Sequence, residues 1–263
     1  MRLLDDFLHD GFLRFPADMA MLAWARHARH FAAMAARDPA NATWLRCGGT
    51  WFVGVDALPN DTTGRLAGGP PLEGAAADFI RSQLGLSLPL HHAQVSVCYP
   101  GYPQPSPEEN EAAFNFRRKR DAAHVDGLHA EGPDKRRYLK EPHAYILGIT
   151  LTEQSPDAAP LTAWKCSHLI MGRMFAKTLA GTSPDAWHKI DLTTPYQAAR
   201  RQVFADCERI ALPSAPGEAV LVHRHLVHGV APWGEHAVAS TEGRMIAYFR
   251  PEFPAIADWV GPG

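Results

Sequence analysis

Residues 124–129 read HVDGLH. If His124 and Asp126 lie on a β-strand, their side chains point to the same face, because alternate residues of a strand share a face. An imidazole and a carboxylate on one face can form two thirds of a metal site. Chance alone predicts about one H-x-D triplet in a chain of this composition, so the triplet needs support from the surrounding sequence.

A third metal ligand is expected on a later strand. Residues 217–233 read GEAVLVHRHLVHGVAPW, and the apolar run after the glycine favours a strand. This segment offers His223, His225 and His228. Two neutral imidazoles and one carboxylate on one face of Fe(II) leave three coordination positions open, which can take a bidentate 2-oxo acid and then O2.

An arginine should follow, because the far carboxylate of a 2-oxo diacid needs a planar partner with two donors. The next predicted strand is RMIAYFR, which Arg244 begins and Arg250 ends. Arg244 is the preferred anchor, since Arg250 lies at the far end of that strand.

The composition indicates a globular protein with a real core. The chain has 263 residues, of which 46% are hydrophobic and 21% are charged, and we predict one domain over 1–263. A net charge of −2 favours neither nucleic acid nor an anionic membrane as a partner. The acidic start is not a signal peptide, and no apolar run is long enough for a membrane span. Four scattered cysteines favour reduced thiols in the cytoplasm.

Hydrophobic periodicity and turn residues predict short strands with helices gathered towards the N-terminal side. Such a pattern is typical of a β-sandwich or barrel core with helical cover. We predict a polar loop over 103–121, in which FRRKR is either a solvated charge run or an anion-attracting rim. The expected helices cover 3–8, 16–36, 72–84 and 168–179, and the expected strands 12–15, 50–55, 93–99, 144–153, 160–166, 202–206, 219–227 and 244–253.

Together these segments resemble the phytanoyl-CoA dioxygenase-like branch of the Fe(II)/2-oxoglutarate-dependent oxygenases. The resemblance covers nearly the whole chain, and KCSH stands where that family commonly has PGSH. In that family the distal ligand is the His of an H-G pair that precedes the Arg, which matches His228 and Arg244 here. The resemblance rests on DDFLHDGFLRFP (5–16), HVDG (124–127), APLTAWKCSH (159–168), GEAVLVHRHLVHGVAPW (217–233) and GRMIAYFRPEF (243–253).

The resemblance implies a mainly β fold with helical cover, a double-stranded β-helix of the jelly-roll or cupin-like barrel type. It implies that His124, Asp126 and His228 bind iron and that Arg244 anchors 2-oxoglutarate. Fe(II), 2-oxoglutarate and O2 would then hydroxylate a small-molecule metabolite, with release of succinate and CO2. Asp126 favours hydroxylation, because the halogenating relatives lack this carboxylate.

Further residues are expected around the site. Gln94, Tyr145 and Trp164 are predicted to contact the cosubstrate, with ordinary strand or packing roles as the alternatives. The segments 99–123 and 127–142 are predicted to cover a small polar or acidic substrate. Arginines that flank the H-x-D triplet could meet an anionic group; they are Arg117, Arg118, Arg136 and Arg137.

Two other functions are compatible with the same residues. A His/His/Asp site with an open position could bind zinc and activate water, in which case Arg244 would have no special role. A non-catalytic barrel that binds a small molecule would depend on no metal and would tolerate loss of Asp126.

Overall fold

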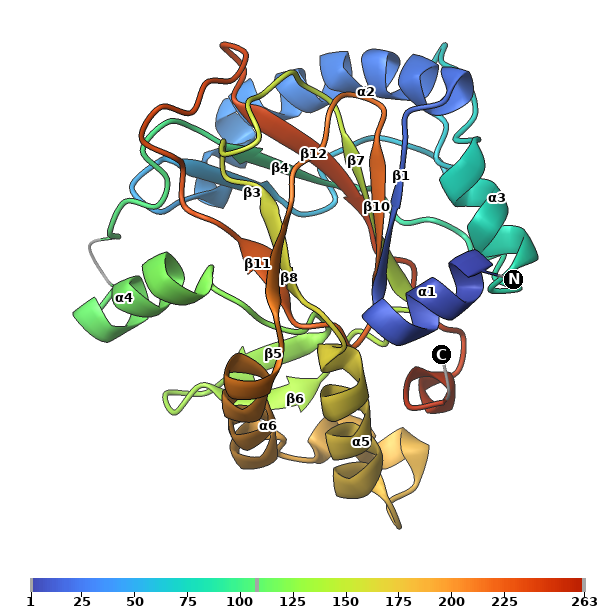
Figure 1. Cartoon of the computed structure of the whole chain (residues 1–263), viewed down its shortest axis with the longest axis vertical. Coiled ribbons are helices and arrows are strands. Elements are labelled where there is room, and N and C mark those ends of the chain that lie inside the picture. The colour runs from blue at the N-terminus through green and yellow to red at the C-terminus, as the bar shows by residue number, and fades with distance from the viewer. Residues whose placement is uncertain (1, 107–108, 262–263) are drawn as a thin grey trace.

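Two antiparallel sheets pack face to face, and the helices lie on their outer sides (Figure 1). The computed structural model describes residues 2–106 and 109–261. The larger sheet has the order β1-β10-β7-β12-β4-β3-β2 and the smaller one β11-β8-β9. The strands of the larger sheet are β1 (Phe12–Phe15), β2 (Leu45–Arg46), β3 (Trp51–Gly54), β4 (Gln94–Cys98), β7 (Tyr145–Thr150), β10 (Ala219–His223) and β12 (Arg244–Phe249). Those of the smaller sheet are β8 (Leu161–Trp164), β9 (Arg209–Leu212) and β11 (His228–Val230), and β5 (Leu128–Glu131) and β6 (Arg136–Leu139) form a separate hairpin.

Strand β7 lies near the middle of the larger sheet and is buried along its whole length. Its alternate side chains reach different layers, as the period of two requires. Leu147 and Ile149 belong to the core under the N-terminal helices, whereas Ile146 packs between the sheets with Leu161 and Ala163 of β8. Burial on both faces explains why β7 reads as a continuous apolar run.

Helices cover both outer faces of the sandwich. Asp18 stabilises two of them, because its carboxylate accepts hydrogen bonds from the backbone N–H of Met21 and of Ala75, each at the start of a helix. Within the described residues, none of the helices has the length and apolarity that a membrane span requires. The helices are α1 (Arg2–Asp10), α2 (Met19–Arg37), α3 (Ala75–Ser82), α4 (Glu111–Arg120), α5 (Ser167–Leu179) and α6 (Thr193–Asp206), with short 3₁₀ turns η1 (Pro39–Trp44), η2 (Pro184–Lys189) and η3 (Ile256–Trp259).

The predicted β core with helical cover is confirmed in outline. No strand pairing among the described residues joins the two sheets, so the structure is a sandwich around a cavity, and closure into a jelly-roll or cupin-like barrel is not confirmed. The helices predicted at 16–36, 72–84 and 168–179 are present, with ends shifted by a few residues.

Three local predictions were wrong. The strand predicted at 202–206 is the end of α6, whose buried side chains Tyr196, Ala199 and Val203 recur at helical spacing. Part of the loop predicted at 103–121 is helix α4, which begins at the N-cap Asn110. The strand predicted at 219–227 ends at His223, because a turn after β10 carries the chain from the larger sheet to β11 in the smaller one.

Candidate metal centre

Backbone pairing brings the two distant histidines together. His124 and His228 form an isolated antiparallel bridge, in which each N–H donates to the carbonyl of the other at 2.9 and 3.0 Å. Asp126 lies in the turn that follows, so the prediction that the triplet sits on a regular strand was wrong. Gly127 completes this turn at φ +84°, where a Cβ would also collide with the carbonyl oxygen of Glu141.

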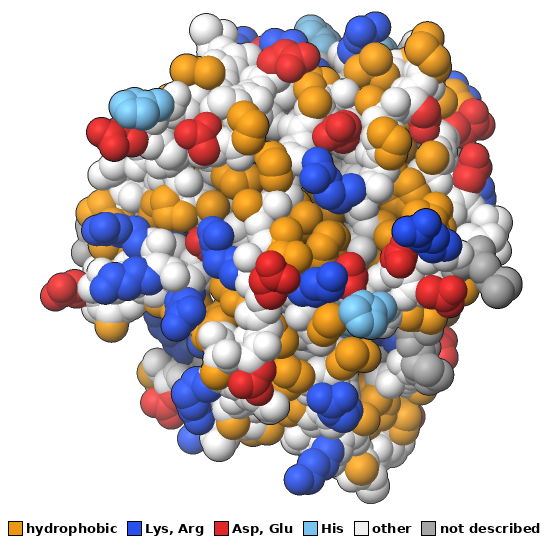
Figure 2. Space-filling model, viewed as in Figure 1, with side chains coloured by type: hydrophobic (Ala, Val, Ile, Leu, Met, Phe, Trp, Pro, Cys, Tyr) orange, Lys and Arg blue, Asp and Glu red, His pale blue; other side chains and the backbone are white. Residues whose placement is uncertain are grey.

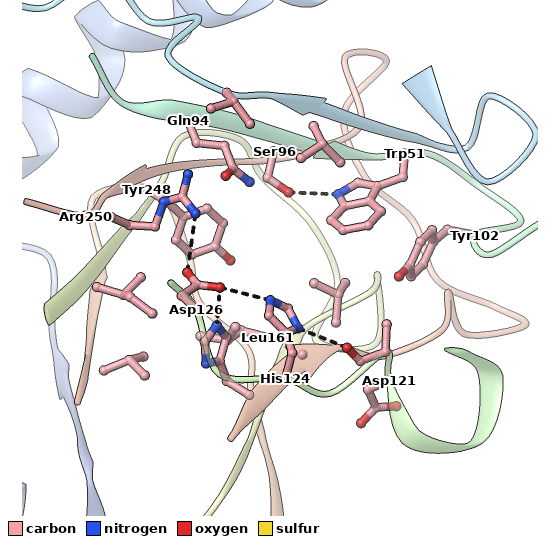
Figure 3. Close-up of a pocket in the computed structure, with 18 residues that line it drawn as sticks. Trp51, Gln94, Ser96, Tyr102, Asp121, His124, Asp126, Leu161, Tyr248 and Arg250 are labelled. Atoms are coloured by element: carbon pink, nitrogen blue, oxygen red, sulfur yellow. Dashed lines mark hydrogen bonds and ion pairs between the residues drawn. The ribbon is translucent and has the colours of Figure 1, made fainter. Parts of the chain in front are cut away.

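The three predicted ligands converge on one point (Figure 3). Oδ1 of Asp126 lies 3.0 Å from Nε2 of His124 and 3.7 Å from Nε2 of His228. One ligand atom from each of these residues falls within 4.8 Å of the others. The alternative ligands His223 and His225 lie elsewhere, in a buried aromatic cluster with His168, Phe175 and Trp259.

The main chain fixes the orientation of both imidazole rings. Nδ1 of His124 lies 2.9 Å from the carbonyl oxygen of Ala122, and Nδ1 of His228 lies 2.9 Å from that of Leu226. A carbonyl can only accept, so each Nδ1 carries the proton and donates it. In the neutral form of each ring, Nε2 therefore carries the lone pair and faces Asp126, where it can bind a metal, which is the usual arrangement of histidine ligands.

The protonation states also suit a metal. Burial raises the pKa of Asp126, but the neighbouring imidazoles of His124 and His228 and the guanidinium of Arg250 outweigh burial and hold that pKa well below its usual range. Burial lowers the pKa of His228, against the opposing effect of Asp126. A carboxylate and a neutral imidazole are the forms that bind metals, so little proton release is needed at neutral pH.

The ligands open onto a cavity of about 250 Å³ between the two sheets. One wall is polar and contains Gln94 and Ser96 of β4, with Trp51 donating a 3.0 Å hydrogen bond to Ser96 (Figure 3). The remaining walls are largely apolar, with Ile146, Leu161 and Val222 among them. Gln94 therefore has the position predicted for a cosubstrate contact, whereas Trp51 and Ser96 had no signal in the sequence beyond strand alternation.

The two arginines of the last strand occupy different places. Arg250 lines the cavity at the metal end, where its Nη1 lies 3.4 Å from Oδ2 of Asp126. Arg244 is not among the residues that line this cavity; it is 1% exposed, borders a small separate cavity with Leu212, and its Nη1 has no hydrogen-bond partner among the residues that the structure describes. Tyr248, four residues on, lines the cavity, and its buried hydroxyl also lacks a partner among those residues. Because Arg244 and Tyr248 share one face of β12, both point between the sheets.

Two residues predicted to contact the cosubstrate do not line this cavity. Tyr145 lies on the opposite face of β7 from Ile146 and borders a different cavity, next to Ile80 of α3. Trp164 faces away from the sandwich interior and packs on Phe204 of α6, with ring centroids 5.3 Å apart. Both side chains fill the core under helices, which was the alternative role for each.

No protein-family model matches the sequence, and no curated protein matches it. Several solved structures share its fold. The non-heme alpha ketoglutarate dependent epimerase SnoN from nogalamycin biosynthesis superposes with a TM-score of 0.55 at 16% identity, over 95% of this chain and 80% of that one. The corresponding carbocyclase SnoK gives 0.52 at 13% identity, over 98% and 87%. EctD from S. alaskensis, solved with 2-oxoglutarate and 5-hydroxyectoine, gives 0.51 at 17% identity, over 95% and 74%.

The chain therefore has the fold of non-haem iron and 2-oxoglutarate-dependent enzymes. The narrower resemblance to the phytanoyl-CoA dioxygenase-like branch stays a prediction from the sequence.

Proposed function

We propose that the protein is a non-haem Fe(II)- and 2-oxoglutarate-dependent dioxygenase that hydroxylates a small-molecule metabolite. The observation that carries this proposal is the convergence of His124, Asp126 and His228, with both Nε2 atoms turned towards Asp126, at the mouth of a cavity between two sheets. Two imidazoles and one carboxylate on one side of a metal are the donor set that leaves positions open for a bidentate ligand and O2.

The residues around the triad fit 2-oxoglutarate as well. Its chelating end would lie at the metal, where Arg250 offsets the negative charge beside Asp126. Its far carboxylate would meet Arg244 and Tyr248, whose buried Nη1 and hydroxyl lack partners among the described residues. A buried guanidinium nitrogen without a hydrogen-bond partner is costly, and an incoming carboxylate would supply that partner.

The chain's own groups would bind and orient while the cofactors supply the oxidation. When bound, iron and 2-oxoglutarate provide the O2-dependent attack on a C–H bond, with succinate and CO2 as products. The triad holds the metal, Gln94 offers an amide to the cosubstrate, and the apolar wall formed by Ile146, Leu161 and Val222 limits the entry of water. Fold neighbours support this assignment, because EctD has been crystallised with Fe and SnoN with Fe3+ and alpha ketoglutarate.

An anaerobic titration tests the proposal directly. Metal-free protein receives Fe(II) and then 2-oxoglutarate, and the weak visible metal-to-ligand charge-transfer band is followed. The band should appear for the native chain, disappear in Asp126→Ala, and persist in the matched control Asp134→Ala, which removes an exposed acid of the β5–β6 hairpin.

Other outcomes separate the alternative functions. Tight binding of Fe(II) or Zn(II) without any band on addition of 2-oxoglutarate would refute the cosubstrate and favour a hydrolase-like metal site. Absence of metal binding to the folded native chain would leave only a non-catalytic small-molecule binder.

A further inference from the structure

A second cavity adjoins the metal centre, in addition to the cavity between the two sheets, which we call the inner cavity. Its volume is about 460 Å³, and it shares Trp51, His124, Asp126 and Arg250 with the inner cavity. We call it the outer chamber. Its walls come from α4, the β5–β6 hairpin and α6, and the first two lie in segments that the sequence predicts as the substrate cover. A substrate would therefore meet the metal from this chamber while the cosubstrate occupies the inner cavity.

Most charged groups of the outer chamber already have partners. Arg117 pairs with Glu109 at 2.9 Å, and Arg250 pairs with Asp126 at 3.4 Å. Glu141 lies 3.2 Å from His129 and 3.2 Å from His143. Each acid that lines the chamber therefore already has a partner.

Two arginines remain in excess. Arg137 of β6 and Arg200 of α6 both line the chamber and are half-buried. Neither has a carboxylate within 4.0 Å in the part of the chain that the structure describes. Figure 2 shows further Lys and Arg side chains gathered over α4, whose last turn carries Arg117, Arg118, Lys119 and Arg120. The chamber and its approach therefore favour an anion.

These two arginines have no carboxylate partner among the described residues but are held in place by the main chain: Nη1 of Arg137 donates to the carbonyl oxygen of Leu128 and Nη1 of Arg200 to that of Ala123, each at 3.4 Å. Their guanidinium carbons lie 5.4 Å (Arg137) and 5.3 Å (Arg200) from the centroid of the same ring, that of Tyr196. The Tyr196 hydroxyl accepts a 3.2 Å hydrogen bond from the backbone N–H of Val125, the residue between His124 and Asp126. One aromatic ring thus joins both cations to the metal-binding segment.

The rest of the chamber suits an organic substrate that carries a charged end. Arg200 also lies over the ring of Phe116, at 4.7 Å, and Leu128 and Val125 add apolar surface nearby. Guanidinium groups that are stacked on aromatic rings keep their N–H edges available for carboxylate or phosphate oxygens.

We propose that the outer chamber binds the anionic group of the substrate, a carboxylate or a phosphate ester, between Arg137 and Arg200. The carbon to be oxidised then lies beside His124 and Asp126. This inference rests on the proposed function, whose substrate class it names.

Paramagnetic broadening by Mn(II) at the triad tests the inference. The full chain is loaded anaerobically with Mn(II) and saturating 2-oxoglutarate, so that the inner cavity is filled. Methyl phosphate is then titrated by ³¹P NMR, and propionate and its neutral analogue propionamide by ¹H NMR. At least one of the two anions should bind, and its NMR resonance should broaden. Propionamide should neither bind nor show broadening.

Arg137→Met and Arg200→Met should each weaken anion binding by at least about tenfold. The matched controls Arg136→Met and Arg201→Met remove exposed neighbours on the same two elements and should bind as the native chain does. Preference for methyl phosphate or for propionate identifies which anion the substrate carries.

Equal binding of propionamide, native-like binding by both chamber variants, or anion binding without broadening in the Mn(II)-loaded chain would overturn the inference. Failure of the proposed function looks different, because Mn(II) and 2-oxoglutarate would then not bind. In that case the anions could still stabilise the metal-free chain. If this stabilisation is lost in Arg137→Met and Arg200→Met, it would still support an anion-binding chamber.

Discussion

Replacing Arg244 by methionine should change stability and cosubstrate binding in opposite directions. The guanidinium is 1% exposed, and its Nη1 has no hydrogen-bond partner among the described residues. A buried polar group without a partner costs about 1–3 kcal/mol, and more when it is charged. Methionine has a similar length and no charge, so Arg244→Met should stabilise the ligand-free protein by about 1–3 kcal/mol and raise its Tm by about 2–6 °C.

The same substitution should weaken 2-oxoglutarate binding. Loss of two charge-assisted hydrogen bonds to the far carboxylate is worth about 3 kcal/mol, or about a hundredfold in Kd. At 100 times the native Kd, bound 2-oxoglutarate stabilises the native chain by about 2.7 kcal/mol, whereas the variant would gain only about 0.4 kcal/mol. Thermal unfolding with Mn(II) in place of iron, with and without 2-oxoglutarate, measures both effects without turnover.

Two outcomes would refute this reasoning. If Arg244→Met lowers the Tm of the ligand-free chain, the buried guanidinium stabilises the native protein, and its unpartnered Nη1 does not carry the expected cost. If the variant keeps the full 2-oxoglutarate-induced increase in Tm, Arg244 is not the anchor, and Arg250→Met should then abolish that increase. Arg14→Met on the exposed edge strand β1 is the control for removing an arginine, and it should alter neither quantity by more than about 0.5 kcal/mol.

Three other predictions concern residues around the site. Burial lowers the pKa of His223 and His225 well below the usual value, so as the pH falls these histidines are protonated in the unfolded chain before they are in the native one. The free energy of unfolding, measured with urea, should therefore be constant above about pH 6.5. Below that pH it should decrease by about 1.4 kcal/mol per pH unit for each histidine. Gly229→Ala would place a Cβ against the carbonyl oxygen of Asp121 and displace the metal-binding histidine beside it, so Mn(II) affinity, measured by calorimetry, should decrease by about tenfold or more; native-like affinity would show that the bridge tolerates the shift. Trp164→Phe should cost about 1–3 kcal/mol of stability because the ring is buried under α6. It should leave the Kd for 2-oxoglutarate unchanged, and a higher Kd would place this ring in the site.

The sequence predicted the site better than its surroundings. The H-x-D triplet and the H-G pair identified three side chains that meet in the structure, since metal ligands are few and their chemistry restricts the residue type. The faces of buried strands were harder to predict. In β7 every residue is buried, so alternation of polar and apolar residues could not show that Ile146, and not Tyr145, faces the cavity.

Long-range packing also escaped prediction. Arg200 precedes a segment that was assigned to a strand, and its position beside the metal depends on α6 packing against the H-x-D segment through Tyr196. Helix α4 has few apolar residues, so apolar periodicity did not reveal it; its N-cap Asn110, its acidic first turn and its basic last turn were the signals that the sequence offered. Contacts between segments far apart in the chain are set by tertiary structure, which local patterns do not encode.

The bridge between His124 and His228 also bears on the order in which the protein assembles. Each of these residues supplies the hydrogen-bond partner for the other's backbone, so neither ligand can reach its place until the H-x-D segment has docked on β11. Closing so long a loop costs entropy that only the surrounding sheets can offset. High-affinity metal uptake should therefore follow folding, and the amide protons of both residues should exchange slowly with solvent even before any metal arrives.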